Sequence, residues 1–333
     1  MGPAMKTSEG ESRTGPSVSV VTIIRKGGEA PFLSSLQNQE YGDPFEIIVV
    51  EGGNRSQARN LGIAQSRAPL ISFIDADCEA PTRWMADLLH GLPDDKVVAG
   101  VGGVSSGKNT ASTQEKAIDA VFSTYLGTLN SPSLISVPDT KRYLVNAISG
   151  HNCLYRRTAL VEVGGFDNRF LLNEDTDLCA RLREKGYRLI LDRSISVQHK
   201  RRENIADFAR QFFWYGVGRI RSTLTNRRCI DDRILALFLV AMSFAFLTPV
   251  SPTLVEAAVL GYFLAVAVAG LVGARRSGTV TLLPVIFLLF VVEHFSYLIG
   301  LLVGIFMGRW KESEMCEPMQ MQRYLVSPTR NGR

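Results

Sequence analysis

Residues 69–77 read PLISFIDAD, in which a proline and a short apolar run are followed by Asp75 and Asp77. The β-branched and aromatic residues of this run favour an extended conformation. Its nearly unbroken apolar character is typical of a strand that is buried on both faces of a sheet. We therefore predict a strand over Pro69–Asp75, with the acidic residues where the chain leaves the sheet.

Similar apolar runs lie on both sides of this strand and alternate with amphipathic stretches. Further strands are predicted at Ser17–Ile24, Phe45–Glu51 and Val97–Val104. Helices are predicted between them at Pro31–Gln39, Arg55–Ser66 and Pro81–Gly91. Strands and helices that alternate in this way are typical of an α/β fold with a mostly parallel sheet.

After residue 104 the alternation weakens. The predicted elements are a helix at Ala111–Leu129, an extended segment at Tyr143–Tyr155, a helix at Glu174–Lys185, two short strands within Tyr187–Val197 and a helix at about 204–225. The last helix carries aromatic residues among arginines, which suits a helix lying at a membrane surface. An amphipathic helix that packs on a protein core is the alternative.

The average composition conceals two different regions. Hydrophobic residues make up 46% of the 333 and charged ones 21%, but between Ile234 and Gly308 the charged residues are only Glu256, Arg275, Arg276 and Glu293. We predict a flexible tail (1–16), an α/β domain (17–230), a transmembrane region (231–308) and a C-terminal tail (309–333). This division excludes a purely soluble enzyme, a disordered protein and a small disulfide scaffold.

Three apolar segments, at about 234–250, 254–272 and 280–307, are near or above the length that crosses a bilayer. Arg233 and Arg275 predict cytoplasmic flanks, and hence a cytoplasmic α/β domain on a plasma membrane or inner membrane. A single crossing by the third segment would place the basic tail outside. Pro284 and the Glu293-His294 pair instead favour a re-entrant or interfacial hairpin, with a true crossing as the alternative. These flanks also explain the net charge of +5, so no nucleic-acid partner is expected.

Asp75 and Asp77 lie where ligands bind in open α/β sheets, beyond the carboxyl ends of the strands. Two carboxylates separated by one residue can both reach a hard cation and the phosphates that it bridges. The spacing alone has little specificity, and solvated turn acids are the plain alternative. Its interpretation therefore depends on the motifs around it.

The surrounding motifs resemble those of the family 2 glycosyltransferases, which have the GT-A fold. Similar to the family's nucleotide-sugar half are Phe45–Glu51, Ala58-Arg59-Asn60-Leu61-Gly62 and Ile71–Asp77 with Pro81 and Trp84. Similar to its acceptor half are Gly150-His151-Asn152, Gly164-Gly165-Phe166-Asp167 and Glu174-Asp175-Thr176-Asp177. The motifs cover about residues 17–220 in the family's order. The resemblance implies a Rossmann-like mixed sheet and metal-dependent, inverting sugar transfer from a nucleotide-diphosphate sugar.

On the donor side, the resemblance implies that Asp77 ligates Mg²⁺ or Mn²⁺ and that Asp75 supports the ribose or a metal-bound water. It places Glu51 near the nucleotide. Arg59 suits either the diphosphate or the acidic strand ends. His199 matches, by position, a further metal ligand of the family, although an ordinary surface histidine is the alternative. Lys200-Arg201-Arg202 would hold the diphosphate or anionic lipid headgroups.

On the acceptor side, the resemblance makes Asp175 the candidate base. A helix N-terminus stabilises its carboxylate and lowers its basicity, which Glu174 and Asp177 help to restore by repulsion. Ordinary first-turn acids of a helix are the alternative. His151 and Asn152 are expected beside the acceptor.

Departures from the family narrow the expected function. The first strand is followed by Arg25-Lys26 without the usual Pro-x-x-Asn, and Gln211–Tyr215 lacks the Gln-x-x-Arg-Trp of processive polymer synthases. We therefore expect transfer of a single sugar. The apolar segments favour a membrane-associated acceptor, either a lipid phosphate such as a polyprenyl phosphate or a lipid-linked glycan. The alternatives are a nucleotidyltransferase of the same fold and a non-catalytic membrane scaffold with a degenerate GT-A domain.

Overall fold

The computed structural model describes residues 15–25, 32–108, 112–128, 140–229, 248–249, 251–307 and 318–327. Its strands are β1 (Val18–Ile24), β2 (Phe45–Glu51), β3 (Leu70–Ile74), β4 (Cys78–Glu79), β5 (Val98–Ser106), β6 (Arg142–Leu144), β7 (Asn152–Arg156), β8 (Arg188–His199) and β9 (Gln320–Val326). Within the described residues they form one sheet with the order β4-β8-β5-β7-β3-β1-β2-β9, and β6 also pairs with β8. The central pairs β1–β2 and β1–β3 are parallel, whereas β7 is antiparallel to both β3 and β5. The predicted mixed α/β fold is confirmed.

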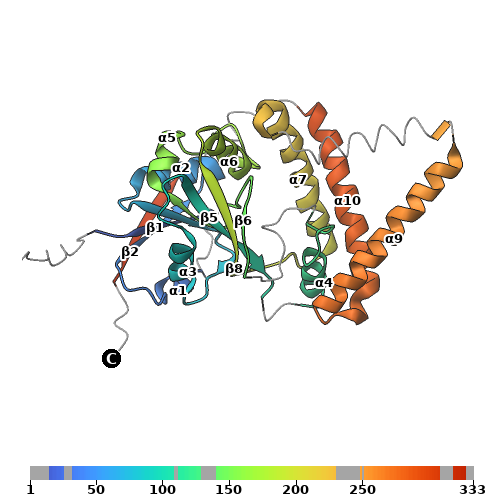
Figure 1. The fold of residues 1–333 in the computed structure, drawn as a ribbon, viewed down its shortest axis with the longest axis horizontal. Helices are drawn as coiled ribbons and strands as arrows, with labels where there is room; N and C mark the ends of the chain where they lie inside the picture. Colours follow the sequence, from blue (N-terminus) through green and yellow to red (C-terminus); the bar gives the residue numbers. More distant parts are fainter. Residues whose placement is uncertain are drawn as a thin grey trace, which may run out of the picture.

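Helices cover both faces of this sheet (Figure 1). They are α1 (Phe32–Gln37), α2 (Arg55–Gln65), α3 (Trp84–Gly91), α4 (Thr113–Phe122), α5 (Arg157–Glu162), α6 (Glu174–Glu184), α7 (Ile205–Thr225), α9 (Pro252–Arg276) and α10 (Leu283–Phe306). One buried core joins the sheet to α1 and α3, and a second joins it to α2, α5 and α6. Helix α2 begins with a capping box between Asn54 and Gln57. It approaches β1 so closely that a Cβ at Gly62 would lie 2.3 Å from Val21 Cγ1.

Two predicted elements in the second half of the domain differ in extent. The two short strands expected within Tyr187–Val197 are one strand, β8, whose register against β5 shifts between Gly102 and Val104. The interruption that the sequence suggests is therefore a bulge within a continuous strand. The extended segment expected at Tyr143–Tyr155 is divided between β6 and β7.

The region 309–333, expected to be a tail, contains strand β9. It pairs antiparallel with β2 over seven residues, from Gln320 opposite Glu51 to Val326 opposite Phe45. Arg323 Nε lies 3.4 Å from Glu46 Oε2, and its Nη2 donates to the carbonyl oxygen of Gln65 at 2.6 Å. Strand β9 lies at the edge of the sheet and remains largely exposed. Its sequence therefore lacks the alternation of apolar and polar residues from which a strand can be predicted.

Helix α7 lies between the α/β domain and α10. Its Phe208 and Phe212 rings pack against Phe122 of α4, with centroid distances of 6.2 and 6.0 Å. On the other side α7 and α10 run parallel through glycine contacts, and a Cβ at Gly300 would lie 2.0 Å from Phe213 O. The buried aromatic residues of α7 therefore pack against other helices of the protein. This agrees with the alternative in which the helix packs on a protein core. Whether its outer face lies at a membrane stays a prediction.

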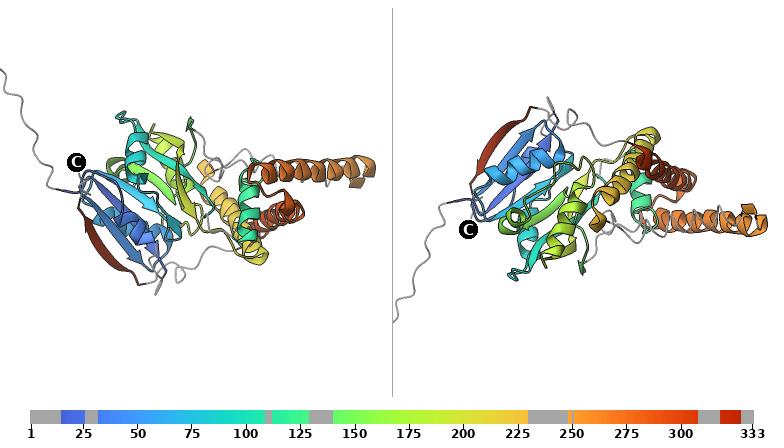
Figure 2. Two further views of the ribbon diagram at one scale, coloured as in Figure 1. Left: turned by 90° about the horizontal axis from the view of Figure 1, so that it is seen from below. Right: turned by 90° about the horizontal axis from the view of Figure 1, so that it is seen from above.

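Two of the three predicted apolar segments lie in described helices. The helical stretches Pro252–Arg276 and Val280–Phe306 are, by length and composition, long and apolar enough to cross a membrane. The segment 234–250 lies outside the described residues apart from 248–249. A hairpin within 280–307 is not formed, because α10 is continuous from Leu283 to Phe306. Pro284 lies in its first turn, where a proline interrupts no helical hydrogen bond. Figure 2 shows α9 projecting away from the α/β domain.

Candidate active site

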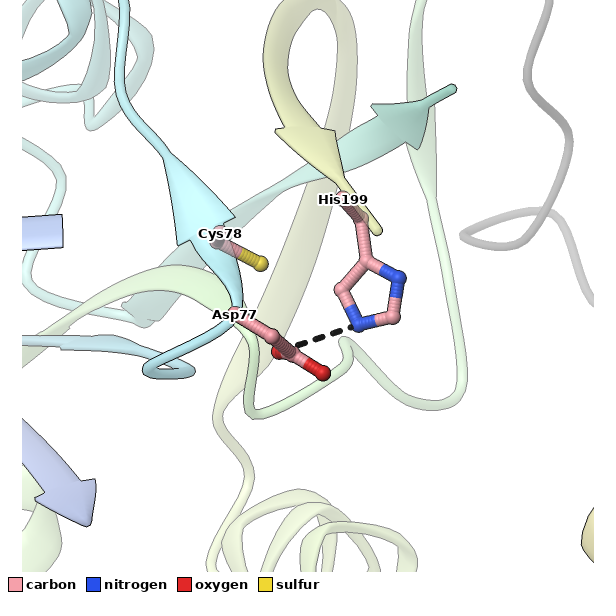
Figure 3. A group of neighbouring side chains, drawn as sticks. All are labelled: Asp77, Cys78 and His199. Atoms are coloured by element: carbon pink, nitrogen blue, oxygen red, sulfur yellow. Dashed lines mark ion pairs between the residues drawn. The ribbon is translucent and has the colours of Figure 1, made fainter. Parts of the chain in front are cut away.

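Asp77 and His199 meet at the carboxyl end of the sheet. Asp77 follows β3, and the short strand β4 then pairs antiparallel with the end of β8, placing Cys78 opposite His199. His199 Nε2 consequently lies 3.3 Å from Asp77 Oδ1, as Figure 3 shows. Burial raises the pKa of the Asp77 carboxyl, but the hydrogen bond and charge of His199, together with a backbone hydrogen bond and the charge of Arg202, hold that pKa below its usual value. Asp77 is therefore an anion at neutral pH.

The donor atoms at this point suit a divalent cation. One ligand atom each from Asp77, Cys78 and His199 lie within 4.8 Å of one another. Burial raises the pKa of the Cys78 thiol well above its usual value, so the sulfur stays protonated and is a poor ligand for a hard cation. His199 Nδ1 is buried without a hydrogen-bond partner among the described residues, so the ring is not committed elsewhere. Asp77 and His199 thus fit Mn²⁺, and fit Mg²⁺ less well because Mg²⁺ prefers oxygen ligands.

Arg59 connects the donor half of the site to the acceptor half. Its Nη1 donates to Glu174 Oε1 at 2.5 Å, and its Nη2 lies 3.4 Å from Asp75 Oδ1 and 3.3 Å from Gly150 O. The guanidinium also lies over the Phe166 ring, 5.3 Å from its centroid. Arg59 and Glu174 are both buried, and breaking such a pair costs about 3–5 kcal/mol. Of the two roles expected for Arg59, the structure supports the one that holds the acidic groups in place.

Asp175 lies beside this ion pair at the start of α6. Asn173 precedes the helix in a left-handed conformation with φ of 59°, which turns the chain into α6. Asp175 Oδ2 accepts from the Gly150 backbone N–H at 3.3 Å, and Oδ1 accepts from the Thr176 N–H at 2.8 Å. Unlike Glu174, the Asp175 side chain is only partly buried and accepts no side-chain hydrogen bond from another described residue. Of the two adjacent acids, Asp175 is the one open to a substrate.

Two residues expected on the acceptor side are buried in structural contacts. Asn152 is fully buried; its Oδ1 accepts from Trp84 Nε1 at 2.8 Å and its Nδ2 donates to Val104 O. Asp177 is buried and bonded to Arg181 and Asn226 at 2.8 and 2.7 Å. The structure brings neither side chain to the open part of the site.

His151 lies beside His199. Its ring centroid is 5.8 Å from that of His199, and its Nδ1 is 2.6 Å from Ser149 Oγ. Burial, together with the nearby His199, lowers the pKa of His151 to about 4, so this ring is neutral at neutral pH. Its Nε2 has no hydrogen-bond partner among the described residues.

The basic residues after His199 differ in their roles. Arg201 is buried; it forms an ion pair with Asp119 at 2.8 Å and lies over the Phe122 ring, which ties α4 to the sheet. All three basic residues line a pocket of about 170 Å³ beside Asp77. Glu51 lies at the end of β2, next to the Gly52-Gly53 turn that contacts the segment before β9.

Sequence reasoning missed Arg55, which lies one turn before Arg59 on α2. The charges of Glu174, Asp75 and Asp175 all act on its guanidinium, so Arg55 lies within reach of the same acidic cluster. The i, i+4 spacing from Arg59 was the available signal, because residues at this spacing share one face of a helix.

Comparisons with known proteins place the chain in a family. Residues 71–305 match the family described as glycosyl transferase family group 2. The pre-mycofactocin glycosyltransferase of Mycobacterium tuberculosis is 31% identical over 162 residues, which are 48% of this chain and 33% of that protein. The succinoglycan biosynthesis protein ExoA of Rhizobium meliloti is 32% identical over 214 residues, 62% of this chain and 61% of that protein. The chain thus spans only part of the length of these relatives.

Among solved structures, the mannosyltransferase PcManGT from Pyrobaculum calidifontis, in complex with GDP-Man and Mn²⁺, aligns with a TM-score of 0.50. The alignment covers 86% of this chain and 88% of that one at 16% identity, a likeness that concerns the fold alone. The family match covers most of the chain and includes both Asp77 and Asp175. The chain therefore belongs to glycosyl transferase family group 2, and it has the GT-A fold.

Proposed function

We propose that the protein transfers a single sugar, with inversion, from a nucleotide-diphosphate sugar to an acceptor held at a membrane. The observation that carries the proposal is the Arg59 bridge. Arg59 joins Asp75 to Glu174; Asp77 lies two residues after Asp75, and Asp175 directly follows Glu174. A donor-side metal site and a candidate base are thereby held at one site.

On the donor side, Asp77 and His199 would hold Mn²⁺ or Mg²⁺. The cation, when bound, supplies positive charge that stabilises the departing diphosphate. Asp75 is fixed by Arg59 and supports the ribose or a metal-bound water, and Glu51 lies at the nucleotide side. Lys200 and Arg202 line the pocket beside Asp77 and add positive charge there.

On the acceptor side, Asp175 is the base. The acceptor oxygen forms a bond to the anomeric carbon while the bond from that carbon to the diphosphate oxygen breaks and its electron pair leaves with the diphosphate. For a hydroxyl acceptor, the proton passes to Asp175. A phosphate acceptor is already anionic, so Asp175 then has less to do as a base and more to do in orienting the attack. A single displacement inverts the anomeric centre.

The apolar surfaces of α9 and α10 support a membrane-associated acceptor, either a lipid phosphate or a lipid-linked glycan. Large hydrophobic side chains of α9 are exposed, among them Leu260 and Leu264. The face of α10 that points away from α7 is exposed and apolar as well, with Phe295, Ile299 and Phe306. Exposed apolar surface of this extent marks an interaction with lipid or another apolar partner.

Strand β9 bears on the topology of this membrane region. Because β9 pairs with β2, both lie on the same side of any membrane, and the chain between α7 and β9 crosses it an even number of times. Arg276, at the end of α9, donates to Ser123 O of the α/β domain at 2.8 Å. Helix α10 starts beside α4 and ends where Arg221 of α7 donates to Met307 O. We infer that α10 lies along the domain without crossing, and that 234–250 and α9 are the two crossings.

Cysteine labelling in oriented vesicles tests this topology. Cys78, Cys153, Cys179 and Cys229 are buried, so a Cys316→Ser background suits single exposed cysteines. Leu325→Cys in β9 and Val161→Cys in α5 are expected to react with a membrane-impermeant maleimide from the same side, and Thr253→Cys at the start of α9 from the opposite side. Labelling of Leu325→Cys from the side of Thr253→Cys would contradict the arrangement.

The reaction itself is tested with the detergent-solubilised protein. A screen of nucleotide sugars is expected to identify one that raises the unfolding temperature only when Mn²⁺ is present, because a ligand at 100 times its Kd stabilises the folded state by about 2.7 kcal/mol. Turnover with that donor is expected to release nucleoside diphosphate. Release of pyrophosphate from a nucleoside triphosphate and a sugar phosphate would instead indicate a nucleotidyltransferase, and absence of any metal-dependent nucleotide binding would indicate a non-catalytic scaffold.

A further inference from the structure

Three consecutive basic residues line the pocket beside Asp77, and two of them are paired with carboxylates. Lys200 is exposed, and its Nζ lies 2.5 Å from Glu203 Oε1. Arg201 is buried, and its Nη2 lies 2.8 Å from Oδ1 of Asp119 on α4. The charge of each of these two residues is therefore offset within the protein.

Arg202 is the third basic residue of the pocket and is held by a neutral group. Its Nε donates to Gln211 Oε1 of α7 at 3.1 Å, and within the described part of the chain no carboxylate forms an ion pair with it. The bond to Gln211 uses one of the five N–H groups of the guanidinium and leaves the four on Nη1 and Nη2 available. Arg202 therefore brings to the pocket a positive charge that no ion pair among the described residues offsets.

Gln211 is itself fixed by the packing of α7. Its Nε2 donates to Tyr215 Oη, one turn along the helix, at 2.8 Å. The Tyr215 ring packs edge-on against Phe212 with the ring centroids 5.5 Å apart, and Phe212 is buried in the core that α7 shares with α4 and α10. These contacts connect Arg202 to a packed core. An arginine that is already held in place loses less side-chain entropy when it binds a ligand.

The position of Arg202 suits a phosphate. Arg202 lines the same pocket as Asp77, the proposed ligand of the cation. Two positive charges repel each other unless an anion lies between them, so an anionic group fits the space between a cation at Asp77 and the guanidinium. The free terminal nitrogens of an arginine present N–H donors in a planar fork, which matches two oxygens of a phosphate group. Both reactants of the proposed transfer carry phosphate at the reacting end if the acceptor is a lipid phosphate.

We propose that Arg202 binds a phosphate group of the reactants through Nη1 and Nη2, and that Gln211 and Tyr215 are positioning residues that hold its guanidinium in place. The phosphate belongs either to the diphosphate of the donor or to a lipid phosphate acceptor. The proposal rests on the proposed function, because it assumes a nucleotide-diphosphate donor. Of the basic residues in the pocket, Arg202 makes the direct contact, and α7 sets its orientation.

The first test compares Arg202→Gln with Arg202→Lys. Arg83→Gln is the matched control, because Arg83 is an exposed arginine at the start of α3 and does not line the pocket. Isothermal calorimetry measures the binding of UDP and GDP in Mn²⁺, and the binding of a polyprenyl phosphate in detergent. Loss of charge-assisted hydrogen bonds is expected to weaken one of these affinities by about 10- to 100-fold. Arg202→Lys should recover part of the loss, because lysine keeps the charge without the fork, and Arg83→Gln should behave as wild type.

The Gln211→Glu variant tests the positioning role separately. Glutamate keeps one oxygen for Arg202 Nε and another for the Tyr215 hydroxyl, but its charge offsets that of the guanidinium. The variant is expected to unfold at the wild-type temperature or above, and to weaken the same affinity as Arg202→Gln. Combining the two substitutions should weaken binding little further, because both act on one contact. A wild-type affinity in Gln211→Glu would remove Gln211 and Tyr215 from the proposal.

The two binding measurements separate the two phosphate sources. Weaker nucleoside diphosphate binding by Arg202→Gln assigns Arg202 to the donor, whereas weaker polyprenyl phosphate binding with unchanged nucleotide binding assigns it to the acceptor. Its unfolding temperature should equal that of wild type, while Arg201→Gln lowers it because Arg201 is buried and paired with Asp119. Wild-type affinities for both ligands in Arg202→Gln would overturn this inference alone. A wild-type protein that binds no nucleoside diphosphate in Mn²⁺ would overturn the proposed function and this inference with it.

Discussion

The Asp77→Ala variant is expected to lose sugar transfer by roughly 10³-fold or more and to lose Mn²⁺-dependent binding of nucleoside diphosphate. Asp77 and His199 are the two side chains that fit the cation, and Asp77 supplies the negative charge of that pair at neutral pH. Without it the cation has only the His199 imidazole as a side-chain ligand, and the charge on the departing diphosphate is not offset. Calorimetry of nucleotide binding with Mn²⁺ and a radiolabelled sugar-transfer assay measure the two effects.

Several controls separate this loss from unfolding. The Asp77 side chain is 45% exposed, so its removal leaves no cavity, and the unfolding temperature is expected to match that of wild type. Asp77→Asn keeps an oxygen for His199 but removes the charge, and should lose activity to a similar extent. Asp94→Ala, at an exposed carboxylate without a described partner, should behave as wild type. With EDTA, wild type should fall to the level of Asp77→Ala; transfer that persists in either case contradicts the metal role.

The Asp175→Asn variant is expected to lose transfer while it keeps donor binding. Removal of a positioned base typically costs about 10²- to 10⁴-fold in rate. Asp175 lies beside the Arg59–Glu174 pair but takes no part in it, so the donor half of the site remains intact. We therefore expect a fall in kcat with an unchanged Kd for nucleoside diphosphate in Mn²⁺. The Asp77→Ala variant, by contrast, is expected to lose this binding.

The chemistry of the acceptor sets the size of this effect. Asparagine keeps the shape of the side chain, although its amide group cannot accept from both the Gly150 and the Thr176 N–H groups. A loss near the upper end of the range indicates a hydroxyl acceptor that needs a base, and a smaller loss indicates an anionic phosphate. Asp94→Asn serves as the control. Full turnover by Asp175→Asn would remove Asp175 from the mechanism.

The sequence predicted the strands of the donor half, and it predicted the strand and helix ends at which the acidic residues lie. Both predictions depend on patterns among residues that are close together in the chain. Apolar runs, the turn after β3 and the acidic first turn of α6 each extend over a few residues. Asp75 and Asp77 were therefore placed at the end of a predicted strand and Asp175 at the start of a predicted helix, while the roles expected of them came from the family resemblance. His199 was identified by position only, and the pairing of β4 with β8 is what brings it to Asp77.

The roles of the neighbouring polar residues depended on contacts between distant parts of the chain. Asn152 and Asp177 lie in motifs of the acceptor half, but packing buries both, and their oxygens accept from Trp84 and from Arg181 and Asn226. A motif shows which residue types are present and not which way their side chains point. The same limit applies to Arg55, whose sequence position is no more distinctive than that of Arg59.

By itself the sequence determined the α/β class, the family and the acids at the strand and helix ends, since periodicity and short motifs are encoded within a few neighbouring residues. Only the tertiary structure decided that Arg59 bridges Asp75 to Glu174, a residue 115 positions away. It also decided that β9 returns to the edge strand β2 and that α10 packs along α7. The physical reason is that burial and ion pairing depend on which distant segments meet, and one residue type serves equally in a buried ion pair or at a substrate site.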